Sequence, residues 1–261
     1  MPPTMFSQLS QDLRTRSSAV LLTIDTRLDR ILQAWLLIAG LLSAARITLS
    51  PHPAGAPVFS TWASYMLLVV APFASTLLAL RWFREGHLQP QPVFRLAKFG
   101  RWRKVTQFEA EQHPLHGTSG IMVSLLVGMM LNVPVRALEY LAAMPPLAAT
   151  APAWLSTLHF AMTFDVVLFG SLYMIAFVAA LRRAPLFPRL LLAIWICDIA
   201  MQLFTADLVT AAGNLPPDVA SALHGLLDGN VKKVLISAAL WLPYLLLSTR
   251  VNVTYRRRIP A

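Results

Sequence analysis

The chain has 261 residues, of which 56% are hydrophobic and only 13% are charged. Soluble domains carry about 25% charged residues, so this composition excludes an ordinary soluble domain and favours a membrane protein. The formal net charge is +10. In a membrane protein such a surplus usually reflects basic loops that fix topology, so we expect no nucleic-acid partner.

Residues 1–30 contain four arginines and three aspartates, with apolar residues at partly helical spacing between them. This pattern predicts a cytoplasmic tail with an interfacial helix on the membrane surface. The tail is too long for the head of a secretory signal, so we expect the first span to stay attached.

Six apolar stretches follow, each close to the roughly 20 residues that cross the hydrocarbon of a bilayer. We predict an all-α, polytopic membrane bundle with six transmembrane helices. Five are expected at about 31–49, 62–80, 119–138, 155–181 and 231–255, and the fifth in chain order leads from a basic elbow at 182–189 to about 210. The organisation divides into the tail (1–30), a first helix pair with a long basic loop (31–117) and a four-helix unit (118–257). The loop at 82–117 mixes basic and aromatic residues, which is typical of a segment lying on anionic lipid. A headgroup-binding or partner-binding loop is the alternative.

The distribution of lysine and arginine predicts the topology. The N-terminal tail, the second connection, the fourth connection and the C-terminal tail hold 4, 6, 3 and 4 of these residues, and the other three connections hold none. Because basic loops stay in the cytoplasm, both termini are expected on the cytoplasmic side.

Three stretches of the second half share the pattern of one family. They are LLVGMMLNVPVRAL (125–138), LRRAPLFPRLLLAIWICDI (181–199) and ALWLPYLLLSTRVNVTY (239–255). The last is the most specific, through Trp241, Pro243, Tyr244, Ser248, Arg250, Val251, Thr254 and Tyr255. Together they resemble the bacterial inner-membrane family known as domain of unknown function 2569. The resemblance covers about 118–257. It implies a four-helix membrane domain in a bacterial inner membrane, without a settled activity.

Polar residues within the predicted spans are the candidate site, because a charged group at the centre of a span costs about 2.5–3.5 kcal/mol on insertion scales. Asp165 and Asp198 each lie about ten residues into a span, which places both near mid-membrane. A spacing of four puts Asn132 and Arg136 on one helix face. The full set of candidates is Arg46, Asn132, Arg136, Asp165, Asp198, Gln202, Lys232 and Lys233.

These residues support two readings. In the first, the cations form an outward-facing cavity that meets a lipid headgroup or another anion, with Asp165 and Asp198 deeper as a proton or cation relay. In the second, the charges pair internally and lock the bundle. Arg136 would then pair with Asp198 or Asp207, and the two lysines with Glu139 or Asp228.

The sequence favours a non-enzymatic protein that binds or transports a small anionic or amphiphilic molecule. The leading alternative is a structural, accessory or protective subunit that docks on another membrane protein or on a second copy of the chain. An intramembrane enzyme comes third. No phosphate loop, dinucleotide fingerprint or metal-ligand spacing is present, so the sequence predicts no cofactor and no metal.

Overall fold

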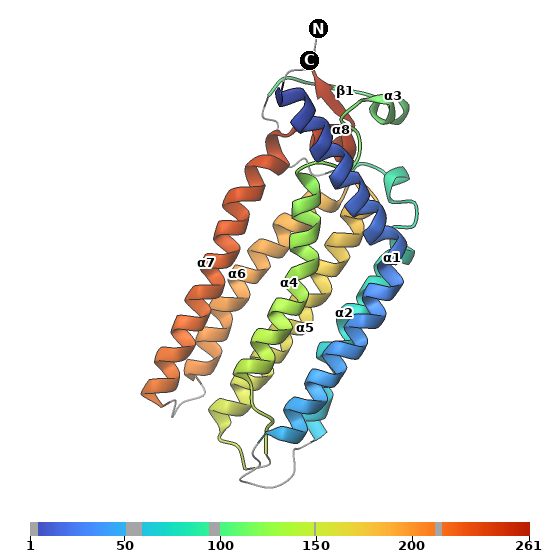
Figure 1. Cartoon of the computed structure of the whole chain (residues 1–261). Helices are drawn as coiled ribbons and strands as arrows, with labels where there is room; N and C mark the ends of the chain where they lie inside the picture. Colours follow the sequence, from blue (N-terminus) through green and yellow to red (C-terminus); the bar gives the residue numbers. More distant parts are fainter. Residues whose placement is uncertain (1–4, 51–58, 94–99, 149, 212–215) are drawn as a thin grey trace.

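The computed structural model describes residues 5–50, 59–93, 100–148, 150–211 and 216–261 (Figure 1). The chain is almost entirely helical, which confirms the predicted all-α class. Three features predicted from the sequence lie outside the described residues. They are the turn at 51–58, the loop residues Arg95 and Lys98, and the helix break at Gly213 and Asn214.

Six helices are long and apolar enough to cross a membrane within the described part of the chain. They are α1 (Met5–Leu49), α2 (Phe59–Trp82), α4 (Met122–Ala143), α5 (Ala153–Leu181), α6 (Phe187–Ala211) and α7 (Pro217–Leu247). Large apolar side chains on these helices, such as Leu41, Ile196 and Ile236, are more than half exposed. An outward apolar surface of this kind suits lipid and not water, because soluble proteins bury most such side chains.

The central helix is α5, which packs against α2, α4 and α6. Gly170 of α5 permits a close approach to α2, since a Cβ added there would lie 3.3 Å from Cγ of Pro72. On one side α1 packs on α2, where the Trp35 indole N–H donates to the Val69 carbonyl. On the other side α7 packs on α6 but not closely on α4, so the α4–α7 side of the bundle stays open.

Two predicted helix starts are wrong. The expected interfacial helix in the tail is instead the first part of α1, which runs without interruption from Met5 to Leu49. The last helix begins at Pro217, 14 residues before the predicted start at Val231. Pro216 and Pro217 initiate this helix, as proline does well at a first turn. Leu223 and Leu227 then bury one face of the added turns, which outweighs the weak helix propensity of Gly225.

The predicted sixth helix also ends early, at Leu247, and a separate helix α8 (Thr249–Arg256) follows Ser248. Side chains of α8 satisfy the carbonyls left at the break. Asn252 Nδ2 donates to the carbonyl oxygens of Leu246 and Ser248, at 3.2 and 3.0 Å. Because a helix end must find partners for its free carbonyls, Asn252 explains why the chain can turn here.

Residues of the C-terminal motif fix α8 to the end of the bundle. Tyr255 is buried and donates its hydroxyl to the Ala180 carbonyl at the end of α5. Thr254 Oγ1 accepts the Gly117 N–H at 3.0 Å, and Arg250 donates to Ser119 Oγ at 2.9 Å. These contacts join the last helix to the segment before α4 and to α5.

The first turns of α1, the C-terminus and the basic loop meet at one end of the bundle (Figure 1). Strand β1 (Trp102–Lys104) of the loop pairs antiparallel with β2 (Arg258–Pro260) at the C-terminus. Near them lie the 3-10 turn η1 (Gly86–Leu88) and the short helix α3 (Gln107–Gln112). Arg182 of the fourth connection forms an ion pair with Asp25 of α1 at 3.3 Å. All four segments rich in lysine and arginine therefore share one end, as the charge pattern predicts.

Candidate functional site

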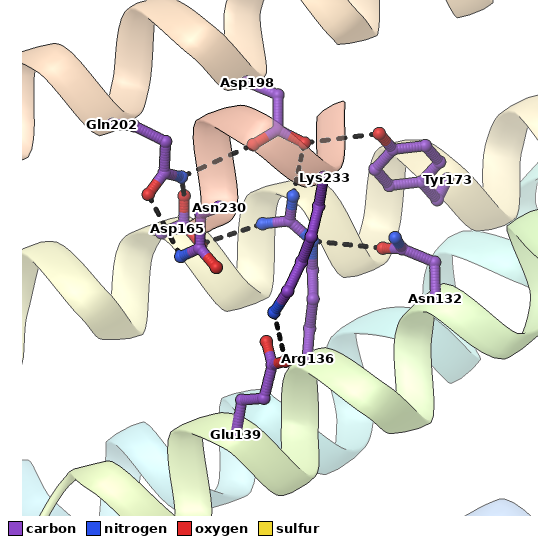
Figure 2. Close-up of polar contacts among 9 residues, drawn as sticks. All are labelled: Asn132, Arg136, Glu139, Asp165, Tyr173, Asp198, Gln202, Asn230 and Lys233. Carbon is purple, nitrogen blue, oxygen red and sulfur yellow. Dashed lines mark hydrogen bonds and ion pairs between the residues drawn. The ribbon is translucent and has the colours of Figure 1, made fainter. Parts of the chain in front are cut away.

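A cluster of charged residues occupies the interior of α4, α5 and α6, with Arg136 at its centre (Figure 2). Its Nη1 lies 3.0 Å from Oδ2 of Asp165, and its Nη2 is bonded to Asp198. Its Nε donates to Oδ1 of Asn132, one turn earlier on α4, at 3.0 Å. One guanidinium therefore joins three helices. Asp165 and Asp198, which the sequence predicted at one depth, both contact it.

A second set of bonds holds the carboxylates from the opposite side. Gln202 Nε2 donates to Oδ1 of Asp165 at 2.8 Å and to Oδ1 of Asp198 at 3.4 Å. Asn230 of α7 donates to Oε1 of Gln202 at 3.2 Å. Asp198 has no exposed surface, and Asp165 and Gln202 are also buried. Buried carboxylates persist only with such partners, because losing hydration without them is costly.

Two aromatic rings enclose the guanidinium. Its carbon lies 5.1 Å from the centre of the Phe169 ring and 5.8 Å from that of Tyr173, within the range of cation–π attraction. The Tyr173 hydroxyl also donates to Asp198 at 3.2 Å. With both aspartates ionised the cluster carries one net negative charge, which a proton or a cation would neutralise.

A cleft of about 720 Å³ lies between α4 and α7 and reaches this cluster. Arg136, Asp165 and Asn132 line it, together with the aromatic residues Tyr173 and Trp241. Its lining spans Leu125 to Ala143 on α4 and Gly225 to Trp241 on α7, which at 1.5 Å per residue is a length of about 25 Å. Most of the exposed surface in the cleft is apolar, with the polar groups gathered around Arg136.

Small residues on both walls keep the cleft open. A Cβ added at Gly128, Gly225 or Gly229 would meet no atom within 4 Å outside its own helix backbone. Gly225, Gly229, Lys233 and Ser237 follow one another at a spacing of four and all line the cleft from α7. This spacing keeps the four residues on one helix face, so this stripe of α7 carries a single long side chain, that of Lys233. Trp241 continues the stripe one turn further along.

The structure brings together five of the eight candidates from the sequence: Asn132, Arg136, Asp165, Asp198 and Gln202. Lys233 lies on the cleft wall and forms an ion pair across it with Glu139 of α4. Lys232 lies outside the cluster, exposed and paired with Asp228 one turn earlier on α7. Arg46 is also elsewhere and donates to the Met144 carbonyl at the end of α4.

The internal pairs that the sequence suggested are therefore present. Arg136 pairs with Asp198, and the two lysines pair with Glu139 and Asp228. Asp207, the other suggested partner of Arg136, forms no ion pair among the described residues. Internal pairing and a cleft coexist in the same molecule, so the two readings do not exclude each other.

Sequence reasoning missed the contributions of Phe169, Tyr173 and Asn230, and the wall formed by Gly225 and Gly229. Asn230 and both glycines fall in a stretch that the sequence assigned to a connection. The spacing of four residues from Gly225 to Ser237 indicates one helix face with small side chains. It has this meaning only when the whole stretch is assigned to a helix. The aromatic residues gave no signal, because aromatic residues are common throughout apolar spans.

These findings support a multi-pass membrane protein that contacts the lipid bilayer and has a polar cluster at the base of a lateral cleft. Comparison of the chain with protein-family models, curated proteins and solved structures finds no match.

Proposed function

We propose that the protein binds or transports a small amphiphilic molecule in the cleft between α4 and α7. The observation that carries this proposal is the combination of a long, mostly apolar cleft with one polar group of residues around Arg136. Ligand sites typically have this composition, in which apolar walls supply affinity and a few polar groups fix orientation. The tail of the ligand would lie along α4 and α7, and its head against Asn132, Arg136 and Asp165.

Charge pairing favours an amphiphile over a small free anion. Each cation of the cleft already has a carboxylate, since Arg136 contacts two aspartates and Lys233 contacts Glu139. A free anion would add to the negative charge that Arg136 and its two aspartates already carry. Two of the five N–H donors of Arg136 remain unused by the described residues, so a neutral or zwitterionic head with an acceptor oxygen is accommodated more easily.

Asp165 and Asp198 would act as a relay by exchanging a proton or a cation when the ligand head arrives. The support is their shared contact with Arg136 and the uncompensated negative charge of the three groups. Intramembrane ionisable residues are functional candidates for this reason.

The test is to identify what the protein retains on purification. Wild type, the double variant Gly128→Leu/Gly229→Leu and the matched control Gly40→Leu are purified in mild detergent, and co-purifying lipophilic molecules are quantified by mass spectrometry. A Cβ at Gly40 also meets open space, but Gly40 lies on α1 away from the cleft. We expect one molecule class to be retained by wild type and the control and lost from the double variant. Equal retention in all three would contradict the proposal.

A docking groove for a transmembrane helix of another protein is a second candidate. Gly225 and Gly229 form a small-xxx-small pattern with open space above it, which is the surface that a tightly packed membrane helix prefers. In this case the purification would recover a protein in place of a lipophilic molecule, and the double variant would lose that protein.

The location and the orientation are also proposed, as a bacterial inner membrane with both termini in the cytoplasm. The support is the gathering of basic residues at one end of the bundle. Cys197 is the single cysteine and is first replaced by serine. New cysteines are then introduced one at a time at Arg101 and Thr150, which lie at opposite ends of the bundle. A membrane-impermeant maleimide should label the cysteine at 150 in intact spheroplasts and the one at 101 only after lysis, and the reverse pattern would overturn the orientation. Membership of 118–257 in domain of unknown function 2569 stays a prediction.

A further inference from the structure

Arg256, the last residue of α8, is buried although it carries a charge. Only 6% of its surface is exposed. Its Nη1 donates to Oδ1 of Asn252 at 3.0 Å and to the Leu246 carbonyl at 3.3 Å. This nitrogen therefore helps to close the break between α7 and α8.

The other two guanidinium nitrogens of Arg256, Nε and Nη2, are buried and have no hydrogen-bond partner among the described residues. Within the same part of the chain, no carboxylate forms an ion pair with Arg256. Buried charges are normally paired, because an uncompensated one costs several kcal/mol. A buried guanidinium with two unused donors is the usual signature of a missing acceptor.

The neighbours of Arg256 add positive charge and do not offset it. Burial lowers the pKa of Arg256 to about 10, and the nearby charges of Arg189 and Arg258 act in the same direction. Arg189 lies in the first turn of α6, where the helix dipole disfavours a cation. Arg258 lies directly opposite Lys104 in the β1–β2 pair, and like charges in this position repel.

We propose that Arg256, Arg189 and Arg258 bind a phosphate group, with the oxyanion accepting from Nε and Nη2 of Arg256. Arginine suits this role, because its planar donors match two phosphate oxygens at once. The side chains of Arg189 and Arg258 are partly exposed, and Arg189 also donates to the Pro185 carbonyl at 3.1 Å. This site lies at the end of the bundle that carries the C-terminus and is separate from the cleft.

The phosphate could belong to a lipid headgroup or be free in solution. The headgroup is the better match, because α8 begins only two residues after the membrane span of α7 ends at Leu247. The headgroup region of a bilayer lies directly outside the hydrocarbon core.

The experiment measures the thermal unfolding of the full chain in nanodiscs. One arm compares phosphatidylcholine nanodiscs with nanodiscs that also contain phosphatidylglycerol. The other arm adds inorganic phosphate to phosphatidylcholine nanodiscs, against sodium chloride of equal ionic strength. We expect phosphatidylglycerol to raise Tm by about 3 °C, as ligand linkage predicts for a lipid concentration a few times above Kd. A rise with inorganic phosphate alone would assign the site to free phosphate.

Variants decide whether the effect belongs to this site. Arg258→Gln leaves the helix break intact and should abolish most of the Tm increase, and Arg256→Lys should weaken it by removing the planar donors. Arg101→Gln removes the same charge from an exposed position at the same end and should keep the full increase. The proposal is overturned if neither phosphatidylglycerol nor phosphate exceeds its control, or if the increase persists in both Arg258→Gln and Arg256→Lys.

Discussion

Arg136 on α4 and Asp165 on α5 are 29 residues apart in the chain, and their side chains meet at 3.0 Å inside the membrane bundle. The same guanidinium contacts Asp198 on α6. The packing of three helices at this level therefore depends on one side chain, which also forms part of the cleft lining.

Replacing Arg136 by leucine should strongly destabilise the protein. The substitution leaves two buried aspartates without their cation, and breaking a buried pair from one side costs about 3–5 kcal/mol. The measurement is the thermal stability in detergent, followed by tryptophan fluorescence. Lys232→Gln is the control, because its pair with Asp228 is exposed and worth about 0.5 kcal/mol. Equal stability of the two variants would show that the central pair does not hold the bundle.

Glycines of the bundle should differ in their tolerance of bulk. Gly170→Leu should cost about 1–3 kcal/mol by overpacking, because Cγ of Pro72 already lies 3.3 Å from the position of a Cβ. Gly229→Leu should leave the free energy of unfolding nearly unchanged, because its side chain enters the cleft. Urea or thermal unfolding of the two variants tests this contrast. A large loss of stability in Gly229→Leu would mean that the cleft is filled by protein.

Removing the hydroxyl of Tyr255 should loosen the end of the bundle by a small amount. Tyr255→Phe deletes the bond to the Ala180 carbonyl, which still accepts the Arg183 N–H, so we expect a loss of about 0.5–1.5 kcal/mol. Hydrogen exchange should rise in α8 and at the C-terminal end of α5, and not in α2. A uniform rise across all helices would contradict the local role of this bond.

The short helix α3 should unravel in acid. The Thr106 backbone N–H donates to Oε2 of Glu109 at 2.8 Å, and this bond, with that from the Thr106 hydroxyl, lowers the pKa of Glu109 below its ordinary value. A carboxylate with a lowered pKa stabilises the fold above its unfolded-state pKa and loses that contribution as the pH falls through the folded-state pKa. Amide hydrogen exchange of residues 107–112 is measured as a function of pH and corrected for the intrinsic exchange rate at each pH. The protection of these amides should fall at low pH. In Glu109→Ala the protection should be low at every pH.

The number of spans and the shared end of the basic segments could be predicted from the sequence, because hydropathy and charge act locally along the chain. The shared level of Asp165 and Asp198 was predictable for the same reason, since rise per residue is constant. The partner of Arg136 was open between Asp198 and Asp207, and its contact with Asp165 was not predicted, because helix packing decides which carboxylates reach the guanidinium. The start of the last helix was wrong, since burial of Leu223 and Leu227 outweighs local propensity and has no local signal.

The sequence suggested a cavity lined by cations, but its position between α4 and α7 could not be predicted, because it results from α7 packing on α6 and not on α4. The positions of Arg46 and Lys232 outside the cluster have the same origin. Arg46 and Lys232 lie toward the same end of the bundle as Arg136, but their side chains project from helix faces that do not point toward Asp165 and Asp198. Sequence spacing gives that face only when the helix boundaries are correct.

Site-specific photo-crosslinking tests the central claim most directly. A photoreactive phenylalanine analogue replaces Ser237, which lines the cleft, or Leu235, which is half exposed on another face of α7. In native membranes the probe at 237 should capture one discrete small amphiphile, whereas the probe at 235 should capture the mixture of bulk lipids. Identical lipid mixtures at both positions, or a protein adduct at 237, would contradict a dedicated amphiphile site between α4 and α7.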